Sequence, residues 1–233
     1  MTRARSNGKP SKLKPPRDAQ RTRLALMRAA EQLFAARGVD AVSLREVSET
    51  AGQRNNSAVL YHFKSREGLI DAILNRHADP IQARYVAQLD LLQAQGKLEL
   101  RTILDVLVRP LVAKLDDADG GPEFVSISAQ LTVNPTMPLF LRPAASSTPG
   151  AMRMAEAIIP LTSIPGELLM MHQERFSNVL YSSIVAFGRL SAENPAPAFR
   201  ELFISDLIDT IHSILTAPPS PRTQALLEEA SQG

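Results

Sequence analysis

The stretch SLREVSETAGQRNNSAVLYHFKSREGL, from Ser43 to Leu69, decides the fold of the N-terminal part of the chain. Ser43 is a common N-cap residue, and Glu46 follows it by three positions, a spacing that predicts a capping box at the start of a short helix. Gly52 predicts the end of that helix, because glycine enters a positive-φ turn without strain. A second short helix should follow the polar segment after the turn. Two short helices joined in this way are typical of a helix-turn-helix, whose second helix enters the DNA major groove.

Four features of this stretch together resemble the TetR family of transcriptional regulators. They are a capping serine, an Ala-Gly turn, an aromatic-His-Phe cluster and a Ser-Arg-Glu-Gly-Leu helix start, carried by Ser43, Ala51-Gly52, Tyr61-His62-Phe63 and Ser65 to Leu69. With the preceding helix, the resemblance covers about residues 20 to 78. It implies an all-α protein with an N-terminal three-helix helix-turn-helix DNA-binding domain. It also implies a C-terminal helical domain that binds a small molecule and forms a homodimer.

The segment between the Ala-Gly turn and the aromatic cluster is about one residue longer than the usual family pattern, and Leu60 stands where the family often has Tyr. We therefore expect the start of the second helix to be pushed outward, and we predict that Arg54, Asn55 and Asn56 hold the base readout. Arg can bond guanine and Asn can bond adenine, each through two hydrogen bonds. One of the two Asn residues should cap the helix while the other reads a base.

The remaining predicted DNA contacts come from side-chain chemistry and from the resemblance. Side chains at the first helix of the pair should approach the phosphate backbone, and those around the aromatic cluster suit phosphate contacts. For His62, packing and hydrogen bonding inside the small domain is an alternative. The predicted residues are Ser43, Arg45, Ser57, Tyr61, His62, Lys64 and Arg66.

Charge is distributed unevenly along the chain. Residues 1–77 hold 15 Lys and Arg against 7 Asp and Glu, a net of +8, whereas the rest holds 11 against 17, a net of −6. A basic DNA-binding head on a body that does not bind DNA would show this pattern. Residues 1–17 hold six of the basic residues and no acidic one, so we expect a disordered tail there. That tail either follows the DNA or only adds solubility.

Apolar spacing predicts helices throughout the rest of the chain. They are expected at residues 18–37, 66 to about 78, 98–115, 123–133, 151–161, 166–190 and 199–215. We expect Pro80 to kink or end its helix, and the tail after Thr216 to be frayed. The predicted divisions are a tail at 1–17, a DNA-binding domain at 18–65, an effector-binding and dimerisation domain at 66–217 and a flexible tail at 218–233.

The two helices nearest the C-terminus, expected at 166–190 and 199–215, carry apolar residues on more than one face. One face should meet the core of the same subunit, and the other a second subunit. We therefore expect a C2 dimer through these helices, with Phe187 and Ile211 at the contact.

The effector site implied by the resemblance should lie in the helical body. Methionine supplies adaptable apolar surface there, and a few polar groups orient a ligand in an apolar pocket. For the methionines, ordinary core packing is the alternative. The predicted effector-binding residues are Gln130, Met154, Met170, Arg175 and Tyr181.

The sequence also excludes several kinds of chemistry. It contains no Cys, which rules out disulfides, thiolate metal sites and a cysteine nucleophile, and which fits a cytoplasmic location. No apolar run reaches the roughly 18 residues that a membrane span needs, and the N-terminal segment lacks the apolar core of a secretory signal. The sequence has no zinc-hydrolase, esterase or nucleotide-loop motif, so we expect no cofactor, no metal and no enzyme activity.

These observations predict a cytoplasmic homodimeric repressor that binds a palindromic double-stranded DNA operator and is released by a small-molecule effector. Two alternatives remain open at this stage. One is a helical enzyme whose reactive groups lie in the body, and the other is a non-specific, nucleoid-type DNA binder without an effector.

Overall fold

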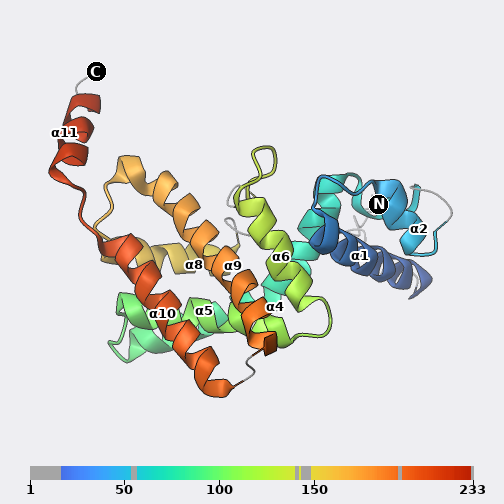
Figure 1. The fold of residues 1–233 in the computed structure, drawn as a ribbon, viewed down its shortest axis with the longest axis horizontal. Helices are drawn as coiled ribbons and strands as arrows, with labels where there is room; N and C mark the ends of the chain where they lie inside the picture. The colour runs from blue at the N-terminus through green and yellow to red at the C-terminus, as the bar shows by residue number, and fades with distance from the viewer. Residues whose placement is uncertain (1–16, 54–56, 140–141, 143–147, 194–195, 232–233) are drawn as a thin grey trace, which may run out of the picture.

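The computed structural model of the chain describes residues 17–53, 57–139, 142, 148–193 and 196–231. Within these ranges the chain forms α-helices, short 3-10 turns and loops, with no strand. The predicted all-α fold is thereby confirmed. Figure 1 shows an elongated molecule, with α1 (Arg17–Arg37) and α2 (Leu44–Thr50) at one end and α11 (Pro221–Ala230) at the other. Across the described ranges, no helix has the length and apolarity needed to cross a membrane.

The N-terminal unit comprises α1, α2, α3 (Ser57–Phe63) and the start of α4 (Arg66–Ala94). Ser43 caps α2 as predicted: its Oγ accepts from the Glu46 amide at 3.2 Å, and Glu46 Oε2 accepts from the Ser43 amide at 2.8 Å. Gly52 turns the chain after α2 with a φ of +72°. The core of this unit contains most of the residues that apolar spacing indicates, namely Phe34, Val42, Val47, Val59, Phe63 and Leu69.

Helix α4 does not end near residue 78, as the sequence predicts, but runs through Pro80 to Ala94. A proline inside a helix removes one backbone hydrogen bond and costs about 3 kcal/mol. Pro80 is exposed, whereas Ile81, Tyr85 and Leu89 on the following turns are buried against the body. Their burial offsets the cost of the proline, because each large apolar side chain contributes about 1.5–3 kcal/mol.

The body is built around α4 from helices that cross one another. Helix α8 packs against α4, α10 against α5, and α9 against both α6 and α10. The helices expected at 98–115, 123–133, 151–161, 166–190 and 199–215 are confirmed, within a few residues at each end. The elements are α5 (Leu100–Ala113), η1 (Lys114–Asp116), α6 (Gly121–Thr132), α8 (Pro149–Ile158), η3 (Ile159–Leu161), η4 (Gly166–Leu168), α9 (Leu169–Glu193) and α10 (Pro197–Thr216).

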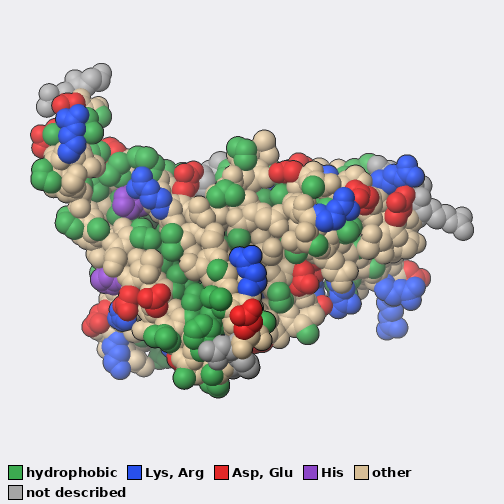
Figure 2. All heavy atoms as spheres, in the orientation of Figure 1, with side chains coloured by type: hydrophobic (Ala, Val, Ile, Leu, Met, Phe, Trp, Pro, Cys, Tyr) green, Lys and Arg blue, Asp and Glu red, His purple; other side chains and the backbone are tan. Residues whose placement is uncertain are grey.

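The residues expected at a subunit contact lie inside one subunit. Phe187 and Ile211 are 1% and 0% exposed. The Phe187 ring stacks on Phe203 with centroids 4.1 Å apart, which ties α9 to α10. The prediction for these two residues is therefore wrong. The outer surfaces of α9 and α10 instead carry Leu190 and Leu202, which are 55% and 64% exposed. Figure 2 shows hydrophobic side chains over this part of the molecule.

The chain after Thr216 forms helix α11 rather than the frayed tail that its prolines suggest. Ser220 caps this helix by accepting from the Thr223 amide at 3.3 Å, and Pro221 occupies the first turn, where a missing N–H costs nothing. None of the α11 residues is buried, and α11 stands apart from the body in Figure 1.

Candidate functional sites

The predicted DNA-binding side chains that stay exposed cluster around α2 and α3. Arg45 projects from α2 and pairs with Glu49 at 2.8 Å. Tyr61 on α3 is 72% exposed. Lys64 follows α3 with a φ of +72°, and its Nζ donates to the Tyr61 carbonyl oxygen at 3.2 Å. Ser43 and Ser57 are also exposed. Arg54, Asn55 and Asn56, the predicted base readers, lie outside the described residues.

Two of the residues predicted to contact DNA, Arg66 and His62, are partly buried within the N-terminal unit. Arg66 donates to the carbonyl oxygens of Val39 and Val42 at 2.7 and 2.6 Å, and its guanidinium lies over the Phe34 ring. It therefore fastens the loop after α1 to the start of α4. His62 is half-buried, and burial, followed by the nearby positive charges, lowers the pKa of its imidazole. The ring is accordingly neutral at pH 7 and can contact a phosphate only as a neutral hydrogen-bonding group.

A buried carboxylate lies at the junction between the N-terminal unit and the body. Glu31 on α1 is 2% exposed, and Arg76 Nη1 on α4 donates to both of its oxygens at 2.7 and 2.8 Å. His77 Nε2 lies 3.1 Å from Glu31 Oε1, and Lys114 Nζ lies 3.4 Å from His77 Nδ1. Gly120 makes room for the carboxylate, since a Cβ there would approach Glu31 Oε2 to 2.7 Å. A carboxylate this deeply buried needs a paired cation, and Arg76 supplies it.

The network continues to the surface through two aspartates in the loop before α6. Arg76 donates to the Asp119 carbonyl oxygen at 2.8 Å and pairs with its carboxylate, which also accepts from Arg28 at 2.8 Å. The hydrogen bond from Arg76, together with that from Arg28, lowers the pKa of Asp119. The bond from Lys114 similarly lowers the pKa of Asp117. We call this set the charged seam: Arg28, Glu31, Arg76, His77, Lys114, Asp117 and Asp119.

Neutral hydrogen bonds reinforce the same junction. Gln130 on α6 donates from Nε2 to the Phe34 carbonyl oxygen at 3.0 Å, and its Oε1 accepts from the Val39 amide at 2.9 Å. Asn134 donates to Asp40 at 2.8 Å. The structure thus places Gln130, a predicted effector residue, at the end of α1 rather than in the body interior.

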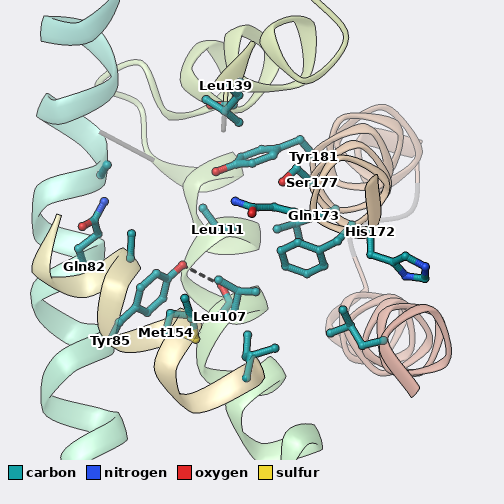
Figure 3. A pocket seen from close by; sticks show the side chains of 18 of the residues that line it. Gln82, Tyr85, Leu107, Leu111, Leu139, Met154, His172, Gln173, Ser177 and Tyr181 are labelled. Carbon is teal, nitrogen blue, oxygen red and sulfur yellow. Dashed lines mark hydrogen bonds between the residues drawn. The ribbon is translucent and has the colours of Figure 1, made fainter. Parts of the chain in front are cut away.

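A cavity of about 240 Å³ lies in the body. Its walls come from α4, α5, α6, α8 and α9, with further residues from the loops and α10. In Figure 3, Tyr85 points into it from α4 and Gln173 and Tyr181 from α9, while His172 is directed toward α10. Its polar side chains carry hydroxyl, amide or imidazole groups, and no Asp, Glu, Lys or Arg is among the described residues that line it. The polar ones are Gln82, Tyr85, Ser128, Thr162, His172, Gln173, Ser177 and Tyr181.

Three hydroxyls of the cavity differ in how they are satisfied. Tyr85 donates to the Leu107 carbonyl oxygen at 3.0 Å. Ser128 on α6 is 0% exposed, and its Oγ makes no hydrogen bond among the described residues. Burial raises the pKa of Tyr181 to about 12, and a weak interaction with the Ser128 hydroxyl, which lies outside hydrogen-bond geometry, opposes that rise. The Tyr181 ring is itself only half-buried, because it borders the open cavity.

The sequence identifies part of this cavity. Met154 and Tyr181, both predicted effector residues, line it, whereas Met170 and Arg175 are exposed on the outside of α9 and do not. Sequence reasoning misses Gln82, Ser128, Gln173 and Ser177. These residues come from three helices far apart in the chain, so no local spacing connects them. A small polar residue on the apolar side of an amphipathic helix, as Ser128 is on α6, is the one signal available.

The N-terminal part of the sequence is similar to known proteins. The sequence profile of the family described as "Bacterial regulatory proteins, tetR family" matches residues 26–73. The HTH-type transcriptional repressor KstR2 of Rhodococcus jostii strain RHA1 is 32% identical over 94 residues, 40% of this chain and 43% of that protein. KstR2 of Mycolicibacterium smegmatis is 34% identical over 65 residues, 28% of this chain and 31% of that protein. The chain thus matches less than half the length of either repressor.

A solved structure extends the likeness beyond the N-terminal unit at the level of the fold. It is assigned to the TetR family and comes from Shewanella sp. PV-4. It aligns with a TM-score of 0.55 and 17% identity over 82% of this chain and 95% of that one. The capped two-helix motif and the profile match over it lead to one conclusion: the N-terminal unit of this chain, over residues 26–73, is similar to that of the tetR family of bacterial regulatory proteins.

Proposed function

We propose that the protein is a homodimeric, sequence-specific DNA-binding regulator that represses transcription and leaves its operator when a small molecule occupies the body cavity. The observation that carries this proposal is the wall shared by the cavity and the charged seam. Phe124 lines the cavity, and its ring stacks on His77 of the seam with centroids 5.0 Å apart. His77 in turn contacts Glu31 on α1 of the N-terminal unit.

Helix α4 supports the same coupling. Leu74, Ala78 and Ile81 line the cavity, while Arg76 and His77 on the same turns belong to the charged seam. A ligand changes an equilibrium only if it binds one conformation better than another. A ligand that displaces Phe124 or α4 would act on the seam directly, and so on the position of α1.

The DNA-binding part of the proposal rests on charge and exposure. Arg45, Tyr61 and Lys64 are accessible around α2 and α3, in the part of the chain that carries the net charge of +8. Lysine and arginine side chains that neutralise phosphates release counterions, so binding should weaken steeply with salt. Two copies of the head, joined through the exposed faces of α9 and α10 around Leu190 and Leu202, would recognise a palindromic operator.

Selection of bound sequences from random duplex DNA tests the proposal. We expect the wild-type protein to enrich a palindrome, with a log–log salt slope of about −0.9 for each phosphate contacted. Lys64→Gly should flatten that slope by about one unit and weaken all sequences alike. The same change should raise the free energy of unfolding by about 1 kcal/mol, because glycine adopts the left-handed backbone at this position without strain.

Lys97→Ala is the matched control, because it removes one exposed lysine in the loop after α4, away from α2 and α3. It should leave the slope unchanged. Enrichment of no sequence, or a wild-type slope near zero, would contradict the proposal.

A further inference from the structure

We propose that the cavity binds an uncharged, mostly apolar molecule of about ten heavy atoms, whose single hydroxyl or carbonyl group is held by Ser128 and Tyr181. The inference rests on the proposed function only in naming this ligand an effector. Binding itself is a separate property of the body and is measured without DNA.

The absence of charge among the described lining residues decides the ligand's charge. A carboxylate or ammonium entering the cavity would lose its hydration shell without meeting an opposite charge. That loss costs several kcal/mol per ion, more than apolar contacts in a site of this size return. Arg142 is buried but is not among the described residues that line the cavity. Its guanidinium donates to Asp71 and to the Glu67 carbonyl oxygen.

The volume decides the ligand's size. An apolar cavity of roughly 150 Å³ is large enough to take up benzene. The cavity here, at about 240 Å³, therefore accommodates a molecule somewhat less than twice that size. Most of its wall is aliphatic or aromatic, with Leu74 and Ile81 contributed by α4, Leu111 by α5, Met154 by α8 and Phe176 by α9. Such a surface suits two small fused rings or an equivalent apolar body.

The unsatisfied hydroxyl decides where the ligand's polar group lies. Ser128 Oγ is fully buried and has no hydrogen-bond partner among the described residues. A buried hydroxyl in this state destabilises the folded protein, and a ligand oxygen that bonds to it would remove that penalty. Tyr181, the neighbouring phenol, stays protonated because burial raises its pKa to about 12, so it supplies a second donor. Tyr85 already donates to Leu107 and has no proton to spare.

Three probes with the same fused-ring body separate these requirements: naphthalene, 2-naphthol and 2-naphthoate. Their affinities are measured by calorimetry or fluorescence titration on the full-length protein without DNA. We expect 2-naphthol to bind about tenfold more tightly than naphthalene, the equivalent of one net hydrogen bond of about 1.4 kcal/mol. The naphthoate should bind more weakly than either.

Ser128→Ala tests the assignment of the polar group. It should reduce the preference for 2-naphthol over naphthalene about tenfold, while leaving the affinity for naphthalene and the thermal midpoint unchanged or slightly higher. Ser126→Ala, two residues away on the same helix and outside the cavity lining, is the matched control and should change neither affinity.

Equal binding of naphthalene and 2-naphthol, or an equal loss for both in Ser128→Ala, would overturn the polar assignment. Tightest binding of the naphthoate would overturn the uncharged class, and binding of none of the three to folded protein would overturn the site. Probe binding that leaves operator affinity unchanged would reject the effector role and leave this inference standing. Intact operator binding with no probe binding would overturn this inference and leave the DNA-binding part of the proposed function standing.

Discussion

The Phe124 ring borders both the cavity and the charged seam, yet the two regions are built from different kinds of side chain. No Asp, Glu, Lys or Arg lines the described part of the cavity, whereas the seam pairs buried Glu31 with Arg76 and His77. Apolar contacts are non-directional and adapt to a range of shapes, while a buried ion pair depends steeply on distance and geometry. The molecule thus connects a cavity whose apolar walls can adapt to a charged seam that has few alternative arrangements.

The largest expected effect comes from the seam. Glu31→Ala should lower the free energy of unfolding by about 3–5 kcal/mol, because it removes the buried partner of Arg76 and His77 and leaves Arg76 paired only with the exposed Asp119. Urea denaturation measures this loss. Glu49→Ala removes an exposed partner of Arg45 and should cost much less, because water and salt screen an exposed ion pair. Similar losses in the two variants would show that the seam is no stiffer than an ordinary surface ion pair.

An intermediate effect is expected where the two regions meet. Phe124→Leu should cost about 1–2 kcal/mol of stability, and it should also remove the ring that contacts both the cavity and His77. The factor by which a cavity ligand changes operator affinity should fall toward one. Phe176→Leu is the matched control, since Phe176 lines the cavity from α9, a helix that carries no residue of the seam. If both variants keep the same ligand response, Phe124 is not the link.

The smallest effect should appear in acid. Asp119 has a pKa lowered by Arg76 and Arg28, so its contribution to stability is complete above the ordinary aspartate pKa of about 3.9 and is lost as the pH falls below it. We expect wild type to lose more stability between pH 6 and pH 3 than Asp119→Asn, by a small margin because Asp119 is exposed. Glu46, with a pKa of about 2, titrates equally in both proteins.

Naphthol binding to the folded fraction should not change over that pH range, since no carboxylate lines the described part of the cavity and the one imidazole, that of His172, is directed toward α10. Calorimetry at both pH values checks this. A parallel loss of ligand affinity and seam stability would erase the contrast between the two regions.

The sequence predicts the elements that short-range rules control. The capping box at Ser43, the positive-φ turn at Gly52 and the helix ends of the body follow from neighbours in the chain, and the structure confirms them. The sequence also identifies Met154 and Tyr181, which line the cavity. A methionine or tyrosine on the apolar face of a helix points to the interior, whether that interior is packed or hollow.

What sequence reasoning misses depends on contacts between distant segments. Arg66 carries the charge expected of a phosphate contact, but carbonyl oxygens more than 20 residues away claim its guanidinium. Gln130 similarly meets a backbone 91 residues away. Judged from its neighbours in the chain, Pro80 predicts the end of a helix. The burial of the turns beyond it keeps α4 continuous. No local sequence pattern predicts the cavity, because a cavity is a space that several helices leave between them.

The continuity of α4 through Pro80 also makes this helix a lever. With 29 residues at 1.5 Å each, it is about 43 Å long and reaches from the DNA-binding unit past the cavity. A tilt of about 5° about one end displaces the other by roughly 4 Å, close to the 3.4 Å rise of one base pair. In a symmetric dimer the two displacements add. In the homodimer that we propose, a displacement of this size at each N-terminal unit would put the two recognition helices out of step with successive major grooves.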